Sequence, residues 1–464
     1  MPSATGKILT KASAANSKDV DIAVEAARKA YKTSWGLKVP GVQRGEMLMK
    51  LANLLEANID EFAALECLNV GKPWVESRGD VDFTIKMFKY YAGWADKIHG
   101  KTIETNEQKL AYTRHEPYGV VGQIIAWNSP LAPALATGNV VVLKPSEITP
   151  LTALKLAGLI NEAGFPPGVD IPRELQLHRI LILEKIAFTG STITGRKIQE
   201  ASAKSNLKVV TLELGGKSPN IIFDDANMEQ AIKWAAIGIL SVYLFMITIL
   251  TNQVDISSNS GQICVAGSRI FVQEGVYDTF MQGFSRAAKG VSTKTGDPFA
   301  TGTMHGPVVS QTQFDRVMSY IDSAKADGAN AFIGGERHSL SEGFFIEPTI
   351  FADCTPAMKI VQEEVFGPVA VVIKFKTEEE VIEMANDTKY GLACAVFTEN
   401  VSRAIRVSNA LEAGTAWVNC YIIGEHNVPF GGYKQSGIGR ELGAHAIDTY
   451  TQVKAVHINV GLKI

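Results

Sequence analysis

The chain is poor in the residues that mark metal-binding, disulfide-rich and nucleic-acid-binding proteins. Only 5 of its 464 residues are cysteine and 8 are histidine. They are scattered without the short spacings of a zinc site or a disulfide framework, which argues against both and suits a reducing compartment. The formal net charge is −3, so no charge excess attracts nucleic acid or an anionic membrane. We therefore expect no metal, nucleic acid or membrane as a partner.

Long apolar runs are also lacking. One uncharged stretch, 235–250, has 16 residues, whereas a membrane-spanning helix needs roughly 20 apolar residues. A buried segment is the favoured interpretation, and a membrane-attached protein is the alternative. The N-terminal stretch 1–18 is rich in Ala, Ser and Lys and faintly resembles a transit peptide. The chain opens on no secretory signal, and we expect a cytoplasmic protein.

The composition that remains is that of a globular enzyme. Apolar residues make up 46% of the chain and charged residues 20%, and the length is sufficient for two or three domains with sizeable cores. Apolar residues at three- and four-residue spacing predict amphipathic helices over 20–31, 42–68 and 83–95. An alternating pattern predicts an extended hairpin over 100–118.

Strand and helix patterns alternate after this hairpin, which predicts parallel sheets with helices on both faces. A first series ends at Glu213, and a second series follows Cys264. The expected strands lie at 119–126, 140–143, 185–188, 208–214, 269–273, 369–375, 393–398 and 453–460. The expected helices lie at 149–163, 192–203, 277–290, 314–327, 378–385 and 401–410.

Two of these regions carry residues suited to covalent acyl chemistry. Cys264 lies in a loop rich in small residues, 261–269. A lone cysteine is most often a buried structural residue, whereas a thiol in such a loop can attack a carbonyl carbon. Glu213 ends an apolar strand, directly before a segment that contains Gly215 and Gly216. A carboxylate in that position is either an exposed strand end or a general base that activates water.

Other segments suit a dinucleotide. Gly190 and Ser191 begin a helix after a strand, and Gly195 follows. Free N–H groups at a helix start bind phosphate, although the same residues make a good helix cap and lack the common glycine fingerprint of dinucleotide sites. Lys144 and Glu147 follow a buried strand. Open α/β sheets bind ligands at that end of a strand, and a capping turn is the alternative.

Taken together and in this order, these segments resemble the aldehyde dehydrogenase superfamily over most of the chain. The resemblance rests on the motifs at 127–130, 144–147, 188–192, 213–218, 261–269 and 363–368. It implies an α/β fold with a doubly wound cofactor-binding domain, an α/β catalytic domain and a small β element for oligomerisation. We place the cofactor domain at 1–98 and 118–213, the catalytic domain at 214–446, and the oligomerisation strands at 99–117 and 447–464.

The resemblance also implies the reaction, which is the NAD-dependent oxidation of an aldehyde to a carboxylic acid. By the resemblance, Cys264 adds to the aldehyde carbon, hydride passes to the nicotinamide, and a thioester remains. Glu213 is then the general base for hydrolysis. Asn128 stabilises the oxyanion together with the Cys264 N–H, with a plain turn asparagine before proline as the alternative.

The cofactor implied by the resemblance is NAD, because a carboxylate at Glu147 would repel the 2′-phosphate of NADP. Glu364 and Phe366 would lie at the nicotinamide ribose and ring, although a surface acidic turn is the alternative for that motif. The implied partners are an aldehyde and further copies of the chain, as a homodimer or homotetramer. The residues expected to bind the cofactor are Trp127, Lys144, Glu147, Gly190, Ser191, Gly195, Leu214, Glu364 and Phe366.

Several stretches depart from the family pattern. The start at 2–7 resembles an internal turn of the family, so the chain is expected to begin late. About two helical turns are missing after Pro130, the sequence at 170–184 replaces an expected strand, loop and helix, and 240–257 looks like an insertion. These departures leave a second hypothesis, in which the protein is a catalytically impaired or silent relative with a structural or binding role.

Overall fold

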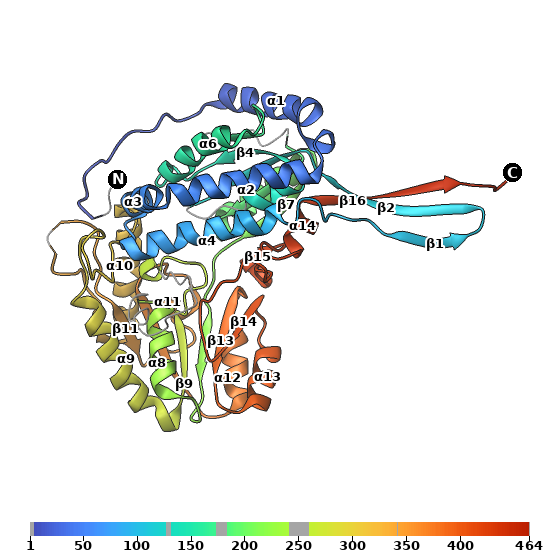
Figure 1. Ribbon diagram of the computed structural model, residues 1–464. Coiled ribbons are helices and arrows are strands. Elements are labelled where there is room, and N and C mark those ends of the chain that lie inside the picture. The colour runs from blue at the N-terminus through green and yellow to red at the C-terminus, as the bar shows by residue number, and fades with distance from the viewer. Residues whose placement is uncertain (1–3, 127–130, 173–182, 241–258, 341, 464) are drawn as a thin grey trace.

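The computed structural model describes residues 4–126, 131–172, 183–240, 259–340 and 342–463. Of the residues singled out in the sequence, Trp127 and Asn128 lie outside this part of the chain, as do Pro130, most of 170–184 and all of 240–257 except Leu240. The described residues form three sheets with helices packed around two of them (Figure 1).

The first sheet has six strands in the order β15-β7-β6-β3-β4-β5. All neighbouring pairs are parallel except β15 with β7. The order reverses between β3 and β6, which is where open α/β sheets bind ligands beyond the carboxyl ends of the strands. The strands are β3 (Val120–Ile124), β4 (Val140–Lys144), β5 (Asp170–Pro172), β6 (Lys185–Thr189), β7 (Val209–Glu213) and β15 (Gly437–Ile438).

Helices cover this sheet, and their apolar faces form one core with the buried strands. The first helix begins at a capping box, in which Asn16 Oδ1 accepts from Asp19 N at 3.4 Å and Asp19 Oδ2 accepts from Asn16 N at 2.9 Å. The helices are α1 (Ser17–Thr33), α2 (Gly41–Ala57), α3 (Ile59–Val70), α4 (Trp74–Ala92), α5 (Leu131–Ala136), α6 (Leu151–Ala163), α7 (Thr192–Lys204) and α14 (His445–Thr449).

The second sheet has seven strands in the order β10-β11-β12-β9-β8-β13-β14, parallel except for β10 with β11. The strands are β8 (Pro219–Ile222), β9 (Arg269–Gln273), β10 (Asn330–Ile333), β11 (Thr349–Ala352), β12 (Val369–Phe375), β13 (Ala393–Phe397) and β14 (Thr415–Val418). Its helices are α8 (Met228–Ile237), α9 (Tyr277–Ser292), α10 (Gln311–Ala326), α11 (Lys359–Gln362), α12 (Glu378–Asn386) and α13 (Val401–Ala410).

The third sheet is an antiparallel arm that projects from the rest of the molecule (Figure 1). It consists of β1 (Thr102–Asn106), β2 (Lys109–Pro117) and β16 (Thr451–Asn459) in the order β1-β2-β16. Every residue of β1 is exposed, and so are most residues of β16. The hairpin and the terminal strand expected from the sequence therefore pair with each other, although they are far apart along the chain.

The structure differs from the sequence-based expectations at three places. The helix expected over 42–68 is two helices, α2 and α3, because the chain leaves helical geometry at Asn58, whose Nδ2 donates to Leu54 O at 2.7 Å. A strand that the sequence at 170–184 was expected to have lost is present as β5, which pairs in parallel with β4. The residues of β15 lie in the first sheet, although the sequence division places them with the second.

Candidate active site

Glu213 is the last residue of β7, and its backbone is held from two sides. Its carbonyl oxygen accepts from Gly190 N at 3.0 Å, and the antiparallel strand β15 pairs Gly437 with it. The residue is 8% exposed, and neither carboxylate oxygen has a hydrogen-bond partner among the described residues. Burial, followed by the nearby charge of Glu441, raises the pKa of Glu213 well above its usual value. A carboxyl group of this kind accepts a proton readily once it is ionised.

The glycine pair after Glu213 lets two functional segments approach the backbone. A side chain at Gly215 would clash with the carboxylate of Glu364, and one at Gly216 would clash with the carbonyl oxygen of Cys264. Gly216 N also donates to Glu364 Oε1 at 3.0 Å. Glycine is therefore required here for space, and the pair brings Cys264 and Glu364 next to the end of β7.

Cys264 lies in the loop that leads into β9, and the loop is fixed just beyond the thiol. Tyr421 Oη donates to Val265 O at 2.6 Å, and Gly267 N donates to Gly238 O at 3.0 Å. Cys264 itself is partly buried. Desolvation, followed by the carboxylates of Glu213 and Glu364, raises the pKa of the Cys264 thiol to about 12. The resting group is therefore a thiol, and it needs a base before it can act as a nucleophile.

The expected cofactor residues lie at the carboxyl ends of strands in the first sheet. Lys144 ends β4, and its Nζ pairs with Glu147 Oε2 at 2.8 Å. The Lys144 ammonium group, through this hydrogen bond, lowers the pKa of Glu147. The Glu147 side chain is 68% exposed and stays ionised at neutral pH. A charged pair open to solvent at this sheet edge suits recognition of hydroxyl groups.

Gly190, Ser191 and Gly195 form the start of α7. Ser191 caps the helix, with its Oγ accepting from Thr194 N at 3.3 Å, and Gly195 N donates to Ser191 O at 2.9 Å. A side chain at Gly195 would clash with the side chain of Leu214, so these two residues, far apart along the chain, pack together. The helix start thus faces the segment after β7, which suits phosphate binding.

Glu364 and Phe366 come from the loop before β12. Burial raises the pKa of Glu364 to about 7, and the Gly216 N–H opposes this shift. Phe366 has a left-handed backbone with φ 60°, and its carbonyl oxygen accepts from Gln313 Nε2 at 2.8 Å. The loop is therefore held against both the glycine pair and α10. This position does not fit the surface acidic turn that was the alternative for this motif.

The structure adds Glu441, a residue that lies outside the sequence motifs described above. Its carboxyl group is buried and close enough to Glu213 to raise that pKa. Burial, opposed by the charge of Lys185, raises the pKa of Glu441 to about 7, and its Oε1 accepts from Tyr450 Oη at 3.1 Å. The sequence signal for it is the charged stretch Gly439-Arg440-Glu441, which does not by itself place the carboxylate beside Glu213.

Lys217 is a second buried group that sequence reasoning left without a role. Its Nζ has no hydrogen-bond partner among the described residues. Burial, and then the charge of Arg269, lowers the pKa of Lys217 to about 7. Lys217 directly follows the glycine pair, and the carboxylate of Glu364 opposes this shift. It therefore adds a weakly basic amine behind the loop that carries Cys264.

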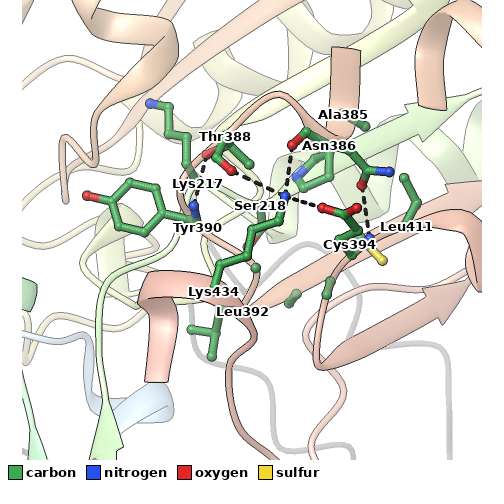
Figure 2. A pocket seen from close by; sticks show the side chains of 15 residues that line it. Lys217, Ser218, Ala385, Asn386, Thr388, Tyr390, Leu392, Cys394, Leu411 and Lys434 are labelled. Atoms are coloured by element: carbon green, nitrogen blue, oxygen red, sulfur yellow. Dashed lines mark hydrogen bonds and ion pairs between the residues drawn. The ribbon is translucent and has the colours of Figure 1, made fainter. Parts of the chain in front are cut away.

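A small pocket lies at the start of β13, and the side chain of Lys434 lines it (Figure 2). The Lys434 ammonium group donates to Asn386 O at 2.9 Å and Thr388 O at 3.3 Å, and pairs with the carboxylate of Glu412. The side chain of Lys217 points away from this ammonium group (Figure 2). Because Lys434 is fully paired, this pocket anchors two loops and is distinct from the grouping around Cys264.

The fold, together with a thiol near a buried carboxylate and a helix start suited to phosphate, is typical of a thiol-dependent α/β dehydrogenase. A sequence model of the aldehyde dehydrogenase family matches residues 1–243 and 247–456. The chain belongs to the aldehyde dehydrogenase family.

Individual relatives agree with this assignment. The chain is 55% identical to an aldehyde dehydrogenase of Agaricus bisporus, covering 99% of this chain and 91% of the relative. It is 47% identical to the mitochondrial aldehyde dehydrogenase of Rattus norvegicus, covering 99% and 88%. The NAD⁺ complex of an aldehyde dehydrogenase from Bacillus cereus superposes with a TM-score of 0.92 at 45% identity, covering 99% and 92%.

These findings confirm the expected family, the α/β fold class, and the reaction, which is NAD-dependent oxidation of an aldehyde. Within the described ranges, no helix is both long and apolar enough to cross a membrane. The same part of the chain holds no cluster of three metal-ligating side chains. The residues that perform the reaction are a separate matter, because family membership does not test them one by one.

Proposed function

We propose that Cys264 is the nucleophile and Glu213 the general base of this aldehyde dehydrogenase. The observation that carries the proposal is the pair itself. A buried carboxylate without a hydrogen-bond partner among the described residues lies near a partly buried thiol, and burial, followed by the charge of Glu213, raises the pKa of the Cys264 thiol. If Glu213 had only a structural role, burying its unpaired carboxylate would destabilise the fold with no interaction to offset the loss.

The chemistry follows from these two groups. Solvent water accepts the Cys264 proton, the thiolate sulfur bonds to the aldehyde carbon, and the electron pair of the C=O π bond moves to the carbonyl oxygen, which becomes an oxyanion. Asn128 and the Cys264 N–H are the proposed donors to that oxyanion. Bound NAD supplies the hydride acceptor. The remaining thioester is then attacked by water, whose proton Glu213 accepts, and the carbon–sulfur bond breaks to release the carboxylic acid.

The residues at the carboxyl ends of the first sheet, together with the loop before β12, fit NAD, and we assign its binding to them. The glycine positions leave space that a side chain would fill, and the start of α7 presents N–H groups for the pyrophosphate. Lys144 and Glu147 would hold the adenosine ribose, and Glu364 the nicotinamide ribose. The remaining proposed contacts are Trp127, Gly190, Ser191, Gly195, Leu214 and Phe366.

A trapping experiment tests the proposed roles. Glu213→Gln protein is mixed with NAD and a short aliphatic aldehyde, quenched in acid, and analysed by intact-protein and peptide mass spectrometry. The expected result is an acyl adduct on the peptide that contains Cys264, at much higher occupancy than in the parent protein. An adduct on another residue, or active enzyme after Cys264→Ala, would refute the assignment.

We also propose that the chain forms a homodimer or homotetramer through the arm. The arm exposes apolar side chains at Ile103, Leu110, Val453 and Ile458, and isolated exposed sheets of this kind favour pairing with another chain. A chain ending at Tyr450 lacks β16 and should dissociate to monomers in size-exclusion chromatography with light scattering. If the shortened chain keeps the mass of the parent assembly, the arm is not the contact.

The domain division and the location in the cell are proposals as well. We place a cofactor domain over 1–98 and 118–213, a catalytic domain over 214–446, and oligomerisation strands at 99–117 and 447–464, and sheet membership supports this division except at β15, which pairs with β7 of the first sheet. All five cysteines are free, which suits a reducing compartment such as the cytoplasm. Imaging of a fluorescent fusion of the chain tests the location.

A further inference from the structure

A strained turn precedes the loop that carries Cys264. Asn259, Ser260 and Gly261 are three consecutive residues in the left-handed region, with φ of 45°, 52° and 72°. Only glycine adopts this geometry freely, and asparagine tolerates it better than serine does. Strain of this kind persists only where the surroundings hold it in place. The turn therefore needs contacts from outside its own backbone.

Part of that support comes from the catalytic side. The side chain of Gln262 is fully buried, with Nε2 donating to Asn259 O at 3.1 Å and Oε1 accepting from Val309 N at 2.9 Å. Ser260 Oγ donates to Gly306 O at 3.2 Å. These bonds tie the turn to the segment before α10. None of these bonds uses the backbone N–H of Asn259, the first residue of the turn, which donates to a different partner.

That partner is Glu76, from the first turn of α4. Glu76 Oε2 accepts from Asn259 N at 3.3 Å, and the residue is 5% exposed. Helix α4 packs with the helices of the first sheet, whereas the turn leads into the second sheet. A carboxylate from the cofactor side thus holds the start of the loop that carries Cys264.

We infer that Glu76 is a positioning residue for the nucleophile loop, acting through Asn259. The inference rests on the proposed role of Cys264. The far end of the loop is fixed by the bond from Gly267 N to Gly238 O, and Glu76 fixes the near end. Reacting groups must be held to within roughly 0.5 Å of productive geometry by such neighbours. Releasing the near end would let the turn relax from its left-handed geometry and would move the thiol.

The test compares variants of Glu76 with a matched carboxylate. Glu76→Ala removes the acceptor, and Glu76→Gln keeps an oxygen that accepts from Asn259 N. Glu66 is the control, because it is also 5% exposed but bonds to Thr152 Oγ1 at 2.9 Å, away from the loop. For each full-length variant, the measurements are kcat, the melting temperature, and the rate at which iodoacetamide alkylates Cys264, followed by peptide mass spectrometry.

Glu76→Ala should lower both kcat and the Cys264 alkylation rate by about 10- to 100-fold, the scale of a 1 Å misplacement. Glu76→Gln should stay close to the parent in both. Glu66→Ala should lower the melting temperature while leaving Cys264 alkylation unchanged. Unchanged alkylation and kcat in Glu76→Ala would overturn the inference, and so would a Glu76→Gln protein as impaired as Glu76→Ala.

If Glu76→Ala does not fold, Glu76→Asp takes its place, because its carboxylate is one methylene shorter and is withdrawn from Asn259 N. A Cys264 alkylation rate that falls in Glu76→Asp but stays at the parent level in Glu76→Gln and Glu66→Gln supports the inference, and equal rates in Glu76→Asp and Glu76→Gln overturn it. Failure of the proposed function is distinguishable, because it would show as aldehyde oxidation that survives Cys264→Ala, whatever Glu76 does.

Discussion

Two glutamates at the same edge of the first sheet show how differently one residue type is treated. Glu147 follows β4, has a side chain that is 68% exposed, and pairs with Lys144. Glu213 ends β7, is 8% exposed, and has no hydrogen-bond partner among the described residues. The pKa of Glu147 is lowered by its lysine, and that of Glu213 is raised by burial and by Glu441.

The difference in exposure and pKa between Glu147 and Glu213 suits one carboxylate to binding hydroxyl groups and the other to proton transfer. A carboxylate that stays charged and solvated holds hydroxyl groups but does not exchange protons at neutral pH. A carboxylate that is desolvated beside a second carboxyl group changes protonation state far more easily. The sequence places both at strand ends, and their different environments support the proposed roles of Glu147 in cofactor binding and of Glu213 in proton transfer. Four predictions test that contrast.

The largest effect is expected on the buried side, from removal of the thiol next to Glu213. Cys264→Ala should reduce aldehyde-dependent NADH formation by at least about 10³-fold, because no other group replaces the covalent step. The measurement is absorbance at the NADH band under saturating NAD. Cys394→Ala, which removes a buried thiol from β13, is the control and should keep most of the activity.

Glu213→Gln should lower turnover by about 10²–10⁴-fold, because water loses its base. The pH profile sharpens the test. Only the ionised carboxylate accepts a proton, so kcat of the parent should rise with pH as Glu213 loses its proton at its raised pKa. The variant should lack that rise, and Glu147→Gln should retain it. A parent profile that is flat from about pH 5 to 9, or identical in Glu213→Gln, would contradict the assignment.

For the exposed carboxylate, Glu147→Gln should change the preference for NAD over NADP without changing the rate of the chemical step. The parent should bind NAD better than NADP, because the ionised carboxylate repels the 2′-phosphate. Neutralising it should narrow the gap by about tenfold, or about 1.4 kcal/mol. Titration of both cofactors against tryptophan fluorescence measures this. If the parent protein binds NADP more tightly than NAD, Glu147 does not lie at the adenosine ribose as proposed.

The smallest effect is on the melting temperature, which should change on substitution of Glu213 but not of Glu147. A folded-state pKa above the unfolded value means that ionising Glu213 destabilises the fold, so its cost is absent at low pH and grows as pH rises through the folded pKa. Glu213→Gln should therefore raise the apparent melting temperature by about 2–4 °C near pH 8, with less gain near pH 5.

Glu147→Gln should show no such gain, because its exposed ion pair with Lys144 contributes little. The melting curves of both variants and the parent are compared by scanning calorimetry at the two pH values. A Glu213→Gln protein that gains more stability at low pH than at high pH would show that Glu213 is not destabilised by ionisation.

Much of the architecture could be predicted from the sequence, because its determinants are local. Alternating apolar residues and short caps define elements over a few residues, and β9, β12 and α13 have the bounds that the pattern predicts. The motifs around Cys264 and Glu213 are also continuous segments, so the family and the reaction followed from them. The roles of individual residues stay predictions, including those of Trp127 and Asn128, which lie outside the described residues.

What the sequence alone determined is therefore the order of elements and which residue types stand at the strand ends. The tertiary structure decided the rest. It divides the helix expected over 42–68 at Asn58, joins β15 to the first sheet, and brings Glu441 beside Glu213. A pKa depends on burial and on charges close in space, whatever their separation along the chain. For that reason only the folded chain distinguishes Glu147, which stays ionised, from Glu213, which can exchange a proton.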